Sequence, residues 1–424
     1  MTQIRAVHRF FPVGQGLFAT GSVEHWPPQK PKRVKTHGRT KPAPVGPYRW
    51  VYDCGSSTNK RLVTNAITDL KGVCKGEKID LLTLSHFHND HISGVVDLLN
   101  EIGAETVMLP WAPLWHRLLI GFEQGLRADD PEMLFFVDPV QYFAQVAGDG
   151  FGQVLFVMPS DGDGPPFPAE PTAAPEDLDD SDKSSGPGEP CSPDELDLSD
   201  NHGDDGVRML RPGLAISVLG VWEFVPYNDP DTEPSDPAGF AAKVDALRDQ
   251  LLNGNDAKRK TALKALRALY EATFGRAAMN DVSLTLYGGA VGPWTGQSIC
   301  DCECFYHRLI GVCGCWKEHE TRGAILLTGD GNLSRPAKWD NLEGYVDARR
   351  ARRTSVFQVA HHGARANWHE GLAALAAPTI SVFSSDPRHS YGHPHAEVLR
   401  DFWSFRPVQV DQHSGFSLHV VLKR

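Results

Sequence analysis

The sequence lacks any long apolar segment. Its 424 residues contain no uninterrupted run of about 18 apolar residues. The opening MTQIRAVHRFF lacks the charged start and apolar region of a secretory signal. The chain is therefore expected to be a soluble cytoplasmic protein that does not enter a membrane. It also lacks internal repeats, and its length suits an α/β enzyme with insertions, folded as one domain over residues 1–424.

Basic residues are almost absent from one stretch. Residues 161–206 hold 15 Asp and Glu but a single Lys, so this stretch alone carries a charge of −14. Since the whole chain carries −11, the remainder carries +3. The stretch is rich in Pro, Ser, Gly and Asp, and burial of its few large apolar residues cannot offset the entropy of ordering. We predict an acidic, disordered insertion here.

Two basic segments stand out in the remaining chain. Residues 27–44, PPQKPKRVKTHGRTKPAP, hold six Lys and Arg and no acidic residue. The second segment, DARRARRTS, contains Arg349, Arg350, Arg352 and Arg353. Each segment is either a solvated surface or part of a track that contacts a nucleic-acid backbone.

Disulfides are not expected, although the chain has eight cysteines, because a large chain without a secretory signal favours thiols or metal ligands. Five of them cluster within 298–320, which we expect to be an inserted hairpin. Alternating cysteines in a hairpin would face one side and could hold a structural zinc ion, with His307 or His319 as further candidates. Reduced thiols and a redox role are the alternatives. The five are Cys300, Cys302, Cys304, Cys313 and Cys315.

Hydrophobic periodicity predicts an alternation of strands and helices. Residues 79–85, IDLLTLS, are typical of a buried strand, and apolar residues then recur at helical spacing up to Ile102. Residues 235–275 are predicted to form a helical insertion. The carboxyl end of the strand at 79–85 leads into SHFHNDHISG, and open α/β folds bind ligands at such strand ends.

Three histidines and an aspartate crowd this segment: His86, His88, Asp90 and His91. Imidazole and carboxylate groups together suit zinc, manganese or iron. Their H-x-H-x-D-H spacing resembles the metal-binding signature of the metallo-β-lactamase fold, a four-layer αββα sandwich of the α/β class. Further segments that resemble this family follow in chain order: VYDCGS, LLTGD ending at Asp330, VAHHG with His361 and His362, and YGHPH with His393 and His395.

A finer resemblance is to the hydrolase domain of ComEC-type DNA-uptake proteins and its stand-alone relatives. It rests on the VGQG turn at 13–16, on the Y-G-H-P motif and on Asn280-Asp281-Val282-Ser283, which matches an N-D-N-S motif imperfectly. The resemblance covers about 1–110 and 208–424. It leaves out the acidic stretch, the helical pair and the cysteine cluster, which are expected to be insertions.

The resemblance implies two divalent metal ions, zinc or manganese, as cofactors. His86 and His88 belong to the first site and Asp90 and His91 to the second. Asp330 bridges the sites or joins the second, and His362 is the remaining ligand. Such ions, about 3.5–4 Å apart, can bind a hydroxide that serves as nucleophile. Asp90, His361 and His393 are the catalytic candidates, and the two histidines are expected to face substrate oxygens or the leaving group.

One departure from the family concerns the first site. Many members supply a third histidine where this chain has Asn280 and Asp281, so Asp281 is a candidate ligand and manganese becomes more favourable. Asp53 resembles the fold's early aspartate, which orients the metal-site loop and is not itself a ligand.

Several functions remain open at this point. The resemblance favours a two-metal nuclease or phosphodiesterase that acts on DNA, with RNA as a variant. The alternatives are hydrolysis of a small phosphoester, hydrolysis of another ester or a peptide, and a regulatory role with little catalysis. Stand-alone relatives also resemble components of bacterial defence gene cassettes, which would give this chain a protein partner.

Overall fold

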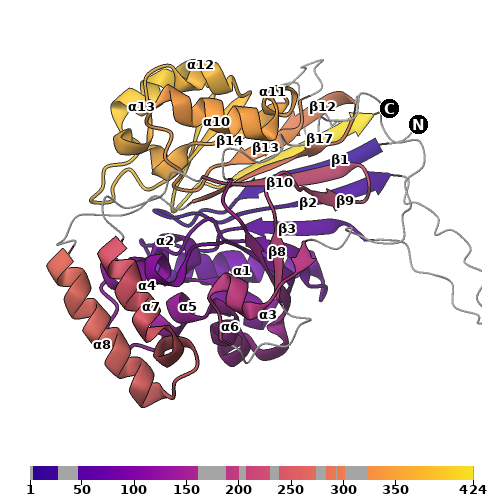
Figure 1. The fold of residues 1–424 in the computed structure, drawn as a ribbon. Helices are drawn as coiled ribbons and strands as arrows, with labels where there is room; N and C mark the ends of the chain where they lie inside the picture. Colours follow the sequence, from indigo (N-terminus) through magenta and orange to yellow (C-terminus); the bar gives the residue numbers. More distant parts are fainter. Residues whose placement is uncertain are drawn as a thin grey trace, which may run out of the picture.

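Two β-sheets pack face to face in the computed structural model, and helices cover the outer face of each sheet (Figure 1). The layers are therefore helix, sheet, sheet, helix, as expected for an αββα sandwich. The first and last strands are neighbours, with Gln3 opposite Lys423. The structure describes residues 3–26, 46–160, 188–199, 207–229, 238–273, 283–292, 294–300 and 322–423.

The larger sheet has ten strands and carries the first half of the candidate site. Its neighbours from β3 to β8 are parallel, so their carboxyl ends meet at one edge. In spatial order the strands are β12 (Thr295–Cys300), β17 (Phe416–Lys423), β1 (Gln3–Phe10), β2 (Ala19–Trp26), β3 (Tyr48–Tyr52), β4 (Ile79–Thr83), β5 (Ala104–Pro110), β6 (Phe151–Val157), β8 (Val207–Leu210) and β7 (Glu189–Pro190).

The smaller sheet has seven strands and carries the second half of the site. Its strands β13 to β16 are parallel, and β11 pairs antiparallel with β13. In spatial order they are β16 (Pro407–Val410), β15 (Ile380–Ser384), β14 (Thr354–Gln358), β13 (Ala324–Leu327), β11 (Leu284–Ala290), β10 (Trp222–Asn228) and β9 (Ile216–Val218).

Helices form the two outer layers. None of the helices in the described ranges is both long and apolar enough to cross a membrane. The first outer layer holds α1 (Lys60–Cys74), α2 (Asn89–Ile92), α3 (Val95–Glu101), α4 (Leu114–Glu123), α5 (Met133–Val137), α6 (Pro139–Ala147), α7 (Ala238–Leu252) and α8 (Asp256–Thr273). The second holds α10 (Pro336–Val346), α11 (Ala348–Ala351), α12 (Leu372–Ala376) and α13 (Ala396–Asp401). Short 3₁₀ turns are η1 (Gly148–Gly150), η2 (Pro193–Leu196), η3 (Ala360–Gly363), η4 (Arg365–Asn367) and η5 (Phe402–Phe405).

The helix α1 illustrates how local sequence produces this packing. Asn59 precedes it, and its side chain accepts a hydrogen bond from the Arg61 amide, which satisfies one free donor of the first turn. Val63, Ile67 and Leu70 follow at helical spacing and are buried against the ten-stranded sheet. The helices predicted within residues 235–275 are observed as α7 and α8, which pack against α4.

The acidic stretch is ordered in part, which corrects the prediction for residues 188–199. Leu196 and Leu198 are 0% and 1% exposed within the core beneath the ten-stranded sheet. The Ser199 hydroxyl donates to the Asp138 carboxylate over 2.7 Å. Apolar contacts and hydrogen bonds to distant residues thus stabilise a segment whose composition indicated disorder. The remainder, 161–187 and 200–206, lies outside the described residues.

Candidate metal centre

The predicted cluster lies directly after β4, as its position in the sequence indicated. The strand β4 ends at Thr83, and the chain then enters α2, whose short turn includes Asp90 and His91. A glycine lets another loop approach closely here. Gly16, in the VGQG turn, has φ +150°, and a Cβ there would lie 2.7 Å from the Asp90 carbonyl oxygen, closer than real Cβ atoms come.

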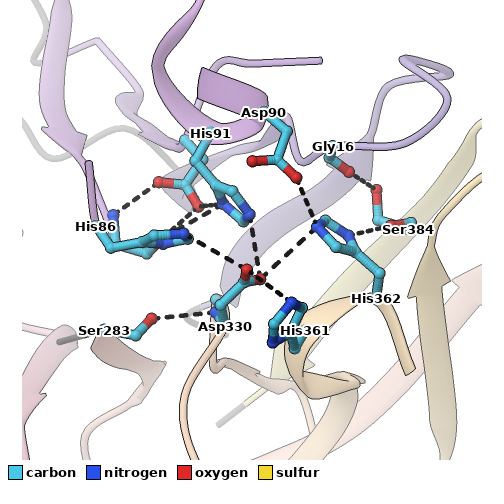
Figure 2. Close-up of polar contacts among 12 residues, drawn as sticks. Gly16, His86, Asp90, His91, Ser283, Asp330, His361, His362 and Ser384 are labelled. Atoms are coloured by element: carbon cyan, nitrogen blue, oxygen red, sulfur yellow. Dashed lines mark hydrogen bonds and ion pairs between the residues drawn. The ribbon is translucent and has the colours of Figure 1, made fainter. Parts of the chain in front are cut away.

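Asp330 lies at the centre of the site, between histidines from both sheets (Figure 2). It follows β13, whereas His361 and His362 follow β14. From the ten-stranded sheet, the Nε2 atoms of His91 and His86 lie 3.1 and 3.5 Å from its carboxylate oxygens. From the seven-stranded sheet, the Nε2 atoms of His361 and His362 lie 3.6 and 3.7 Å away.

Five of the six predicted ligands are brought together. Their atoms form two groups, each with candidate ligand atoms within 4.8 Å of one another, and the role of each residue toward an ion stays a prediction. One group is His86, His91 and Asp330, and the other is Asp90, His91 and His362. Within the second, Asp90 Oδ2 lies 3.2 Å from His362 Nε2.

His88, the sixth predicted ligand, belongs to neither group. Its ring stands edge-on to that of His86, with centroids 4.7 Å apart, and it lines the cavity in front of the site. Burial, followed by the neighbouring His86, lowers the pKa of His88 to about 3. The imidazole is thus neutral at physiological pH, which is the form that binds a metal.

The Nδ1 atoms of the clustered histidines contact the surrounding protein. His91 Nδ1 donates to Asp53 Oδ2 over 2.7 Å. Asp53 is the early aspartate that the resemblance predicts to orient the metal-site loop. The Ser85 hydroxyl also donates to Asp53 and therefore accepts from His86 Nδ1 at 2.8 Å. These contacts fix the tautomers and leave Nε2 of both rings for Asp330 or a metal.

The histidine pair is oriented in the same way from the other sheet. His362 Nδ1 donates to the Ser384 carbonyl over 2.6 Å, and His361 Nδ1 lies 2.8 Å from Asn367 Oδ1. Both histidines have left-handed backbone conformations, with φ +46° and +59°. Such φ values are unfavourable for residues other than glycine, so the surrounding contacts hold this turn in a strained form that directs both rings inward.

The residues fit divalent metal ions. Within the described part of the chain, His86 Nε2, His91 Nε2 and Asp330 Oδ1 are buried and make no hydrogen bond, although His91 Nε2 and Asp330 Oδ1 lie at the ion-pair distance of 3.1 Å from each other. Buried polar atoms rarely lack a partner, and an ion bound by these atoms would supply one. Burial alone would raise the pKa of Asp330, but the imidazoles, His361 and His91 foremost, hold it well below its usual range. The carboxylate is therefore ionised and can bind a cation.

A cavity of about 810 Å³ opens in front of this centre. His361 and His393, the two predicted substrate-facing histidines, both line it, together with Asp90 and Asp330. The ring centroids of His361 and His393 are 5.9 Å apart. Burial, followed by the nearby His362 and His361, lowers the pKa of His393 to about 4.

The arginine cluster lies at the opposite end of the seven-stranded sheet, because it precedes β14 and the histidine pair follows it. Arg350 is 2% exposed, and its guanidinium donates to Glu223 over 2.7 and 3.1 Å. The prediction of a nucleic-acid contact was therefore wrong for Arg350, whose charge is already paired. Arg349 and Arg352 are exposed, and half-buried Arg353 donates to the Ala290 carbonyl.

Some predicted residues lie outside the described ranges. Among them are the candidate ligand Asp281 and the basic residues of 27–44. Cys300 is the last residue of β12. The other four clustered cysteines, Cys302, Cys304, Cys313 and Cys315, also lie outside these ranges.

Sequence reasoning missed several residues that position the site. Ser283 accepts from the Asp330 amide over 3.1 Å, and Asn367 donates to the Asp330 carbonyl over 2.9 Å. Gln358 binds the amides of Thr328 and Gly329 at 2.8 and 2.7 Å. Only Ser283 had a sequence signal, as the last residue of the N-D-N-S-like motif.

Comparison with known proteins gives a family match and a structural likeness. Residues 50–183 match the model of the metallo-beta-lactamase superfamily. Residues 50–183 thus resemble the metallo-β-lactamase superfamily, and the αββα sandwich is the metallo-β-lactamase fold. Among solved structures, it is similar to the metallo-beta-lactamase fold protein YhfI from Bacillus subtilis, at 9% identity and a TM-score of 0.34, over 98% of this chain and 99% of that one. No curated protein matches the chain.

Proposed function

We propose that the protein is a metal-dependent hydrolase that holds two divalent cations and cuts a phosphodiester. The observation that supports this proposal is the convergence of His86 Nε2, His91 Nε2 and Asp330 Oδ1, three buried atoms without a hydrogen bond in the described structure. The choice of a phosphodiester rests on the ComEC-like motifs in the sequence.

The chain's own residues would divide the work as follows. His86, Asp90, His91, Asp330 and His362 would hold the ions, which activate water and neutralise charge on a phosphoryl oxygen. His361 and His393 face the cavity, where they can bind the substrate oxygens or protonate the departing one. His361 Nδ1 is held by Asn367, so its Nε2 is the atom that would exchange a proton.

A turnover assay tests the proposal. Metal-stripped protein refilled with manganese or zinc is offered bis(4-nitrophenyl) phosphate, single- and double-stranded DNA, and RNA. We expect hydrolysis of at least the small diester, and a loss of about 100-fold or more in Asp330→Asn, which removes the charge of a predicted ligand. Asp340→Asn is the matched control, because Asp340 is exposed on α10. Hydrolysis that survives a chelator, or that Asp330→Asn retains in full, contradicts the proposal.

Nucleic acid is the second candidate substrate. The observation in its favour is the pair of exposed arginines, Arg349 and Arg352. These arginines lie at the end of β14 that is away from the metal centre. A polymer would therefore have to reach around the sheet to contact both the arginines and the metal centre. Binding of DNA that weakens steeply with salt would support this candidate.

A further inference from the structure

Two chemically different sets of residues line the cavity beside the metal centre, and we call the parts that they line its polar and its apolar end. The polar end holds His88, Asp90, Asp330, His361 and His393. The other end is lined by apolar and aromatic side chains from α2, α3, α5, α6 and the loop after α4: Ile92, Val95, Val96, Leu126, Phe135, Phe136, Tyr142 and Phe143. A substrate that places its scissile bond at the polar end would therefore extend an organic group against the apolar end.

We propose that this apolar end selects the substrate. This inference rests on the proposed hydrolase function, and the substrate is then a small ester that carries an uncharged aryl or alkyl group. A cavity of about 810 Å³ is far larger than the reacting phosphoester alone needs, and it falls in the range of drug-sized ligand sites. Burial of an aryl group there would contribute to binding in proportion to the apolar area removed from water.

The charges around the cavity favour an uncharged group. Among the described residues that line it there is no Lys or Arg, whereas exposed Glu132, directly before α5, adds a carboxylate. Two bound cations would offset Asp90 and Asp330 but not Glu132. A nucleic-acid strand would bring further phosphates to the apolar end with no cation to pair them, and so would bind less well than an apolar group.

The aromatic wall packs against the metal loop. Phe87, between His86 and His88, packs edge-on against Phe135, with ring centroids 5.3 Å apart. Gln124 donates to the Phe87 carbonyl over 2.6 Å. A group bound against this wall would therefore be held at a fixed position relative to the histidines, which is what positioning for reaction requires.

Binding of two inert phosphonates tests the inference apart from turnover. We expect manganese-loaded protein to bind (1-naphthylmethyl)phosphonate at least about tenfold more tightly than methylphosphonate in calorimetry. Leu126→Trp and Val96→Trp, at half-buried positions of the apolar end, fill the cavity and should reduce this ratio to about threefold or less. Val73→Trp is the matched control, because Val73 is 51% exposed on α1 and does not line the cavity.

A neutral probe separates this inference from the proposed function. Naphthalene-1-methanol should bind metal-free protein and the Val73→Trp control, as followed by naphthyl fluorescence, but not the two cavity variants. Equal affinities for the two phosphonates overturn the inference, as does tighter binding of a dinucleotide than of the naphthyl compound. If the naphthyl preference holds while no phosphodiester is cut, the phosphodiester proposal fails and the apolar specificity stands.

Discussion

The carboxylate of Asp53 sets the orientation and tautomer of His91. It is fully buried, and it accepts from His91 Nδ1 and from the Ser85 amide, each over 2.7 Å. Asp53→Asn keeps the shape but removes the charge, so we expect a 10- to 100-fold loss of metal affinity, on the order of outer-contact substitutions in metal sites. Competition with a chelating dye measures it. Asp97→Asn, which removes a half-buried carboxylate paired with Lys60, should leave affinity within about twofold.

Buried His8 should make the stability of the fold depend on pH, independently of the metal site. It lies between the two sheets, 0% exposed, and its Nε2 donates to the Gly323 carbonyl over 3.0 Å. Burial lowers the pKa of His8 to about 4. The unfolded chain takes up this proton near pH 6.5 and the folded chain only near pH 4, so stability falls as the pH drops through that window.

The consequence is measurable by urea unfolding at pH 7 and pH 4.5. His8→Gln keeps a donor for Gly323 but does not titrate, so the loss of unfolding free energy between these pH values should shrink by about 2–3 kcal/mol. His413→Gln, at an exposed position, is the control and should change this loss by less than about 0.5 kcal/mol. An equal acid sensitivity in His8→Gln and the parent would show that His8 is not the cause.

The residues that sequence reasoning identified are those whose chemistry is concentrated in a short segment. H-x-H-x-D-H places four candidate ligands within six positions, directly after a buried strand. Asn367 and Ser384, which orient the histidine pair, are an ordinary amide and an ordinary backbone carbonyl in the sequence. Their role depends on a strained turn that brings them to the rings, and no spacing rule indicates such a turn.

At the scale of elements, Arg117 joins three segments of the chain. Its guanidinium is 1% exposed and donates to five backbone carbonyls, including those of Phe136 in α5 and Leu196 in η2. Arg117→Met should leave these acceptors without a partner and lower the unfolding free energy by about 3–5 kcal/mol, measured in urea. Arg127→Met, at an exposed ion pair with Asp129, should cost less than about 1 kcal/mol. Similar losses in both variants would refute this role.

These contacts also explain where the element predictions failed. Composition marked 188–199 as disordered, yet Leu196 and Leu198 have a core to enter because Arg117, about 80 residues earlier, binds the adjacent carbonyls. Likewise, the arginine run suggested a phosphate surface, but Arg350 pairs with Glu223, 127 residues earlier. In both cases the deciding partner is distant in the sequence, and local charge or composition cannot report it.

At the scale of the whole molecule, the site joins the two sheets at the carboxyl ends of their parallel strands. Asp330 and the histidine pair come from the seven-stranded sheet, and His86 and His91 come from the ten-stranded sheet (Figure 2). An ion held by both sets would bind the folded chain and not the unfolded one. Zinc or manganese at 100 times its dissociation constant should then raise the unfolding free energy by about 2.7 kcal/mol.

Urea unfolding with and without the metal tests this link, and the choice of variants separates it from adventitious binding. Asp330→Asn alters the residue that contacts histidines from both sheets, so most of the metal-induced stabilisation should disappear, whereas exposed Asp340→Asn should keep it. Because exposed carboxylates bind cations weakly on any protein, only a difference between these two variants assigns the stabilisation to the site. Equal stabilisation of both would mean that the ion binds elsewhere and that the two sheets meet without it.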